Sequence, residues 1–137
     1  MSTRSRIGLL LDDNSILSVY HHWDGYPDGL GAKLAKEFNT KEKAAELIDG
    51  GDISTCMART TWSGVSTDKE TVLYYSERGD SDIEPIIAED DFEFIQQTRN
   101  CNGEFAYVFN TLTNRWCCYD IGAGDFVNLY KEELVNA

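Results

Sequence analysis

Two pairs of short apolar runs, each pair separated by a polar turn, constrain the fold of this chain most. In the first pair, residues 7–11 and 16–20 flank a polar turn at residues 12–15, as expected of two antiparallel strands joined by a tight connection. In the second pair, residues 105–109 alternate large aromatic with smaller side chains, and residues 116–118 follow across another polar turn. Hairpins therefore dominate the strand pattern, which predicts an α+β fold with a mostly antiparallel sheet.

Two helices are expected directly after the first hairpin. Asp28 is a candidate N-cap residue, because apolar residues at helical spacing follow it. The second helix is expected to begin near Asn39 and to end at Gly50 and Gly51, since glycine commonly terminates helices.

The remaining elements mix strand and helix. Residues 71–75 have strong β-propensity, whereas residues 89–99 are predicted as a short helix with Phe92 and Ile95 facing inward. A last helix is expected from about Asp125. The predicted order is β-β-α-α-β-α-β-β-α, with about five strands, and the whole chain of 137 residues is expected to form one domain.

The acidic residues are concentrated in the middle of the chain. The formal net charge is −12, and residues 68–93 supply ten carboxylates against two basic residues, a net charge of −8. Such a field repels phosphate groups and disfavours direct nucleic-acid binding. It attracts a basic surface on another protein, although an acidic surface also serves solubility alone. The carboxylates proposed as binding candidates are Asp80, Asp82, Asp90 and Asp91.

The cysteines and the apolar runs indicate a cellular location. No C-x-x-C pair occurs among the four cysteines, and their spacing matches no common zinc template, so neither a disulfide framework nor a metal or other cofactor is predicted. Cys117 and Cys118 are expected on opposite faces of a strand. No segment reaches the roughly 18 apolar residues of a membrane span, and the run at residues 7–11 is too short for a signal peptide. We therefore expect a cytoplasmic protein that does not bind membranes.

The segment HHWDGYPDGLG, residues 21–31, is the densest in chemically distinctive side chains. It lies at a predicted strand-to-helix junction, where folds often present functional groups. Strand alternation would place His21 and His22 on opposite faces. In a functional interpretation an imidazole pairs with Asp24, or the aromatic rings line a recognition site; in a structural interpretation the segment is a turn with core contacts. Its candidate binding residues are His21, His22, Trp23, Asp24 and Tyr26.

Arg78 is a further candidate, because it lies in the sequence E-R-G-D within the acidic stretch. Pairing with Glu77 or Asp80 would make it a structural ion pair of modest energy. Contact with Asp24 or with a partner would give it a binding role.

Three segments together carry a family resemblance. Residues 18–31 (SVYHHWDGYPDGLG) and residues 47–54 (LIDGGDIS) resemble a family of small phage and prophage proteins that share an H-W-D-G-Y-P signature. Residues 74–80 (YYSERGD) are similar to a later stretch of the same family.

The resemblance covers residues 6–54 well and residues 71–80 loosely. That family has no settled activity, so the resemblance implies no catalytic residues. It implies a phage-encoded accessory protein that acts in the cytoplasm of the host bacterium, which is an analogy of context rather than of chemistry.

Three functions follow as hypotheses. The leading one is a non-enzymatic protein that binds a host protein with a basic surface, such as an anti-CRISPR-like or other anti-defence inhibitor. The second is a small-ligand binding protein, for a nucleotide or metabolite, that uses the H-W-D-G-Y-P loop. The third is a hydrolase or transferase that uses His22, Asp24 and Arg78, provided that these groups converge on an open cleft.

Overall fold

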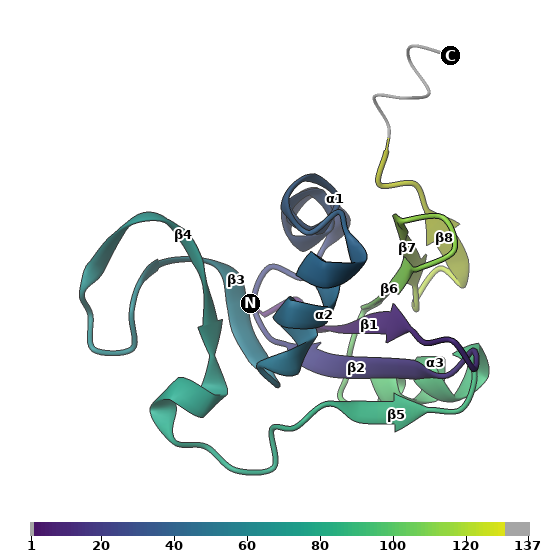
Figure 1. The fold of residues 1–137 in the computed structure, drawn as a ribbon, viewed down its shortest axis with the longest axis horizontal. Helices are drawn as coiled ribbons and strands as arrows, with labels where there is room; N and C mark the ends of the chain where they lie inside the picture. The colour runs from purple at the N-terminus through teal and green to yellow at the C-terminus, as the bar shows by residue number, and fades with distance from the viewer. Residues whose placement is uncertain (1, 131–137) are drawn as a thin grey trace.

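The computed structural model describes residues 2–130, which form a mixed eight-stranded sheet with helices on both faces (Figure 1). The strands are β1 (Ser5–Leu10), β2 (Ile16–His21), β3 (Ile53–Thr60), β4 (Ser66–Tyr74), β5 (Ile86–Ala88), β6 (Phe105–Asn110), β7 (Arg115–Asp120) and β8 (Asp125–Val127). The helices are α1 (Ala32–Glu37), α2 (Lys41–Asp49) and α3 (Asp91–Asn100), with a π-helical turn η1 (Pro27–Gly31) and a 3₁₀ turn η2 (Tyr75–Arg78). The strand order is β4-β3-β2-β1-β6-β7-β8, and β5 pairs with β2.

The predicted α+β class is confirmed, and both predicted hairpins are present. β1 pairs with β2 antiparallel, and so does β6 with β7. The sheet is nevertheless mixed, because β1 pairs with β6 in parallel and β2 pairs with β3 in parallel. It also has eight strands rather than about five, so the predicted element order is wrong.

The three strands that sequence reasoning missed are short or irregular. The register of β3 against β4 shifts three times between Ile53 and Thr60, and each shift breaks the period-two pattern by which a strand is recognised. The far part of this hairpin curves away from the body of the sheet (Figure 1). β5 and β8 have three residues each. Residues 125–127 therefore form β8 instead of the predicted last helix, whose remainder at residues 131–137 lies outside the described residues.

The helices after the first hairpin begin at other residues than predicted. Tyr26 stands at the N-cap position of η1, so the predicted cap at Asp28 is wrong, and Asp28 lies in the first turn. The positive end of the helix dipole still stabilises a carboxylate in the first turn. α2 begins after Thr40, close to the predicted start near Asn39, and the Thr40 hydroxyl accepts a hydrogen bond from the Lys43 backbone N–H at 3.2 Å.

Of the two α3 residues predicted to face inward, Ile95 packs against the core and Phe92 does not. Phe94 and Thr98, four residues apart, are buried, whereas Phe92 is 70% exposed. Gly8 explains this orientation, because a Cβ on Gly8 would lie 3.2 Å from the ring of Phe94. Phe92 is two residues from Phe94 and so points away from the sheet. The prediction that Phe92 faces inward is wrong.

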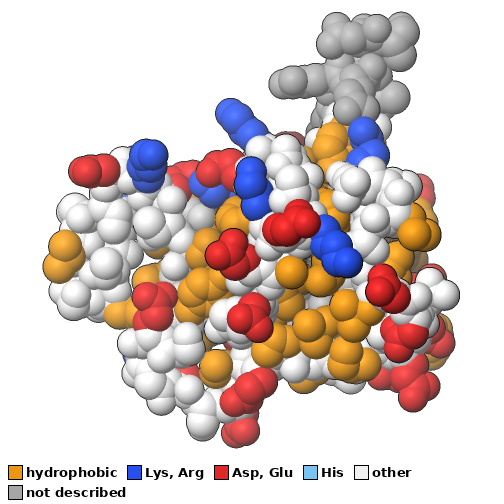
Figure 2. Space-filling model, viewed as in Figure 1, with side chains coloured by type: hydrophobic (Ala, Val, Ile, Leu, Met, Phe, Trp, Pro, Cys, Tyr) orange, Lys and Arg blue, Asp and Glu red, His pale blue; other side chains and the backbone are white. Residues whose placement is uncertain are grey.

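The sheet divides the interior into two apolar layers. The larger layer lies beneath α1 and α2 and includes Ile7, Val19, Leu34 and Tyr107. The smaller layer lies beneath α3, on the other face, and its buried members are Ile16, Ala88, Phe94 and Ala106. Hydrophobic side chains also gather on the surface of the first face beside α2 (Figure 2). Ile87 of β5, which pairs with Leu17 of β2, is about half exposed.

Candidate functional site

His21 is a buried structural group at the end of β2. Its side chain is fully buried, and Nε2 accepts a hydrogen bond from the backbone N–H of Cys56 at 3.1 Å. Burial lowers the pKa of His21 to about 3. The imidazole is therefore neutral at pH 7 and joins β2 to β3.

His22 lies on the opposite face of the strand, as strand alternation predicts. Its Nδ1 is 2.5 Å from the Tyr20 hydroxyl, and its ring meets the ring of Trp23 edge-on with centroids 4.7 Å apart. The His22 imidazole therefore pairs with a phenol and makes no hydrogen bond to Asp24. The backbone of Asp24 adopts a φ of +58°, and its carbonyl accepts a hydrogen bond from Leu30 at 3.0 Å.

The turn at Gly25 is fixed to the segment before β1 and to β6. The Gly25 N–H donates to the Thr3 carbonyl at 2.9 Å, and the Tyr107 hydroxyl donates to the Gly25 carbonyl at 2.7 Å. A Cβ on Gly25 would lie 2.6 Å from Ser5 Oγ, so only glycine fits there. These bonds account for the H-W-D-G-Y-P segment as a structural corner, from which Trp23 and Tyr26 remain partly exposed.

A polar cluster that sequence reasoning missed lies near this corner. Asp52 accepts a hydrogen bond from the Tyr20 backbone N–H at 2.9 Å, and burial raises the pKa of Asp52 and brings that of Tyr20 to about 12. Arg6 is buried beside them, and its Nε donates to Ser18 Oγ at 2.9 Å. The sequence signal for Tyr20 was its position two residues before His22 on one strand face. The shallow depression here is lined by Tyr20, Asp52, Tyr75, Asp80, Ser81 and Ile83.

Arg78 takes the structural role that pairing with Asp80 implies. Its guanidinium lies 2.7 Å from the Asp80 carboxylate and 4.7 Å from the centroid of the Trp62 ring, and it also covers the Tyr75 ring. Trp62 donates its indole N–H to the Tyr74 carbonyl at 2.7 Å. These contacts fold the β3–β4 connection onto η2, so Arg78 does not reach Asp24. His22, Asp24 and Arg78 therefore have separate environments, which does not favour the hydrolase hypothesis.

Some carboxylates of the acidic stretch hold local structure. Glu70 pairs with Lys33, Asp80 pairs with Arg78, and Asp90 accepts a hydrogen bond from the Glu93 N–H as the N-cap of α3. Eight of the ten carboxylates in residues 68–93 make no ion pair with any described residue, and six of these eight lie within residues 82–93: Asp82, Glu84, Glu89, Asp90, Asp91 and Glu93. They lie on the loop before β5 and at the start of α3, and all but Glu93 are exposed. Two of the proposed binding carboxylates, Asp80 and Asp90, thus also hold local structure.

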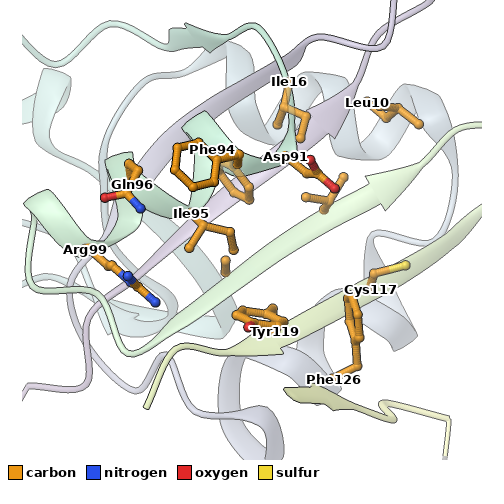
Figure 3. A pocket seen from close by; sticks show the side chains of 13 residues that line it. Leu10, Ile16, Asp91, Phe94, Ile95, Gln96, Arg99, Cys117, Tyr119 and Phe126 are labelled. Atoms are coloured by element: carbon orange, nitrogen blue, oxygen red, sulfur yellow. The ribbon is translucent and has the colours of Figure 1, made fainter. Parts of the chain in front are cut away.

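An open groove of about 530 Å³ lies on the α3 face of the sheet (Figure 3). Its floor consists of sheet residues, and α3 and Phe126 of β8 form its sides. Asp91 and Arg99, from the two ends of α3, lie at opposite ends of it (Figure 3). The floor residues are Ala106, Val108, Cys117 and Tyr119. No sequence motif marked this groove, because its residues come from segments far apart in the chain.

The groove exposes apolar rings and one thiol. Phe92 is 70% exposed and Phe126 is 72% exposed, and the Phe126 ring packs edge-on against Tyr119 at 5.3 Å. Cys117 is exposed while Cys118 is buried, as alternation predicts. Partial burial raises the pKa of the Cys117 thiol, so the thiol is largely protonated at pH 7. These groups suit binding of an apolar surface rather than proton or group transfer.

Within residues 2–130, no group of three or more histidine, cysteine or acidic side chains is placed to hold a metal ion. In the same part of the chain, no helix has the length and apolar character needed to cross a membrane. Comparison with protein families, with curated proteins and with solved structures finds no match to this chain.

Proposed function

We propose that this chain is a non-enzymatic accessory protein that binds a host protein with a basic surface through the carboxylates of residues 82–93. Its resemblance to small phage proteins supports a role in the cytoplasm of an infected bacterium, as an inhibitor of host defence or of other host machinery. The carboxylates at residues 82–93 supply the attraction, and the folded domain holds them in place.

The single observation that carries the proposal is that residues 82–93 contain six carboxylates and no basic residue, and that none of the six makes an ion pair with a described residue. Surfaces of soluble domains typically intersperse charges of both signs. Here α3 begins with Asp91 and Glu93 after the Asp90 cap, and its one basic residue is Arg99 in the last turn. Like charges gathered at one place raise the rate at which an oppositely charged partner associates.

The experiment compares two variants with the same change in net charge. The test variant carries Asp82→Asn, Glu84→Gln, Glu89→Gln and Asp91→Asn, which spares the paired Asp80 and the capping Asp90. The control variant carries Glu42→Gln, Glu46→Gln, Asp49→Asn and Asp68→Asn, four exposed carboxylates outside residues 82–93. Each protein is immobilised on beads and incubated with a bacterial lysate. The captured proteins are identified by mass spectrometry, and the candidate partner is then purified for affinity measurements.

The wild type and the control variant are expected to bind the same basic protein, and the test variant is expected to lose it. Affinity for the purified partner should fall as ionic strength rises, because exposed charges are screened within about 8 Å at physiological salt. Equal capture by the test and control variants would show that these carboxylates do not select the partner.

A further inference from the structure

Two aromatic rings and a carboxylate surround the guanidinium group of Arg78. Its central carbon lies 4.7 Å from the centroid of the Trp62 ring and 5.0 Å from that of the Tyr75 ring, and its Nη2 lies 2.7 Å from the Asp80 carboxylate. Rings and a carboxylate in this arrangement recognise the planar, charged guanidinium group. We infer that Trp62, Tyr75 and Asp80 form an arginine-binding cage, in which an arginine of the protein partner replaces the resident Arg78. This inference rests on the proposed function, since it names the side chain by which the basic partner binds.

The walls of the cage are held in place by contacts that do not involve Arg78. The Trp62 indole N–H donates to the Tyr74 carbonyl at 2.7 Å, which fixes the indole beside the residue that precedes Tyr75. The Trp62 and Tyr75 rings also contact each other, with centroids 5.7 Å apart. Glu77 caps η2 by accepting a hydrogen bond from the Tyr74 backbone N–H at 3.0 Å. The cage is therefore preorganised, which favours the binding of a second guanidinium.

The contacts that hold the resident guanidinium are individually weak. The Arg78 side chain is 50% exposed, and the Asp80 side chain is 35% exposed. Exposed ion pairs and exposed cation–π contacts each contribute little compared with the stability of a whole domain. Arg78 can therefore leave the cage while the domain stays folded, and a second guanidinium can make the same three contacts.

The cage adjoins the carboxylates proposed to attract the partner. Asp80 stands two residues before Asp82, the first of the six carboxylates of residues 82–93. The depression that Asp80 lines also contains Asp52, another carboxylate that makes no ion pair within residues 2–130. A basic segment that these charges attract brings its own arginines to the cage at a high effective concentration, so that they compete with Arg78.

The direct test adds N-acetyl-arginine amide to the Arg78→Ala variant and follows the indole N–H signal of Trp62 by NMR. The variant is expected to bind this probe at least about fivefold more tightly than the wild type does, because the resident no longer competes. N-acetyl-citrulline amide has nearly the same shape but no charge, and should bind the variant about tenfold more weakly than the arginine probe. The matched control is Arg59→Ala, which removes an exposed arginine from β3 and should bind the probe as weakly as the wild type.

Two further measurements locate the binding in the cage. In the wild type, excess arginine probe is expected to move the Nε–H signal of Arg78 toward that of a free arginine, because the probe takes its place. Asp80→Asn added to Arg78→Ala removes the carboxylate of the cage and should weaken probe binding about fivefold. Both substituted side chains are exposed, so the fold should persist, as circular dichroism will check. The indole signals of Trp23 and Trp116, the other two tryptophans, should not shift.

Three results would overturn the cage: no shift of either the Trp62 or the Arg78 signal at about 100 mM probe, equal binding of the citrulline probe, and equal probe binding by Arg78→Ala and Arg59→Ala. The partner captured from lysate should bind Arg78→Ala at least about threefold more tightly than the wild type. Equal affinity of that partner for both proteins would refute the exchange of arginines and leave the proposed function standing. Probe binding in the cage, combined with capture that ignores residues 82–93, would support the cage and refute the proposed function.

Discussion

The burial of His21 makes the stability of the fold depend on pH. The side chain is fully buried with a pKa of about 3, whereas an unfolded chain gives histidine its ordinary pKa of about 6.5. Between these values the unfolded state binds a proton that the folded state excludes. Stability is therefore fully present above pH 6.5 and is lost progressively as the pH falls toward 3.

The loss is large enough to measure. Linkage between the two pKa values gives a decrease of about 2 kcal/mol in the free energy of unfolding from pH 7 to pH 5. Unperturbed carboxyl groups titrate mostly below this range, near a pKa of about 4. Since single domains are stable by only about 5–15 kcal/mol, the urea midpoint should shift clearly.

The assay is urea unfolding of the wild type and two variants at about pH 5, 6 and 7. His21→Gln keeps an acceptor for the Cys56 N–H but does not titrate, so its stability should vary little over this range even though its absolute stability falls. His22→Gln is the matched control, because His22 is the other histidine of the chain and is only partly buried. It should retain most of the wild-type pH dependence.

Two results would refute this account of His21. One is an equal pH dependence in the wild type and in His21→Gln. The other is an imidazole proton of residue 21 that titrates near pH 6 in the NMR spectrum of the folded protein, which would place its pKa at the ordinary value.

Three further substitutions test the corner and the caps by urea unfolding. Tyr107→Phe removes the hydroxyl that donates to the Gly25 carbonyl and should cost about 1–2 kcal/mol, because that carbonyl stays buried. Gly51→Ala should cost about 1–3 kcal/mol, since Gly51 has a φ of +87° and a Cβ would lie 2.5 Å from the Ile83 carbonyl oxygen; Gly64→Ala, with the same φ and open space around it, separates strain from collision. Thr40→Ala should cost about 1 kcal/mol by removing the α2 cap, whereas Thr40→Ser should cost little.

Local patterns predicted the elements that are regular. The alternating aromatic residues of β6 and the polar turn after it specified the β6–β7 hairpin, and Gly50 with Gly51 specified the end of α2. Alternation also placed His21 and His22 on opposite faces, of which the structure buries that of His21. In each of these cases the physical cause acts between residues close in sequence.

The parallel pairings and the short strands have no such local cause. β1 is buried along almost all of its length, and its nearly continuous apolar run is typical of a strand covered on both faces. That run was a signal for a central position between β2 and β6, but it does not name the partner strands. β8 pairs through only three residues, including Phe126 opposite Tyr119. Its position is therefore set by the edge of β7 and not by its own sequence.

The same distinction explains why the most distinctive segment of the sequence is not the best candidate site. Residues 21–31 are distinctive because one tight corner demands a buried acceptor at His21, a left-handed backbone at Asp24 and a glycine at Gly25. The groove makes no such local demand, since Phe92 and Phe126 come from segments 34 residues apart, and each taken alone is an ordinary surface residue. A corner that must be built in one place leaves a recognisable motif, whereas a surface assembled by the sheet from separate segments does not. Binding capacity in this fold is therefore expected where apolar side chains and carboxylates from separate segments stay exposed, away from the corner at residues 21–31.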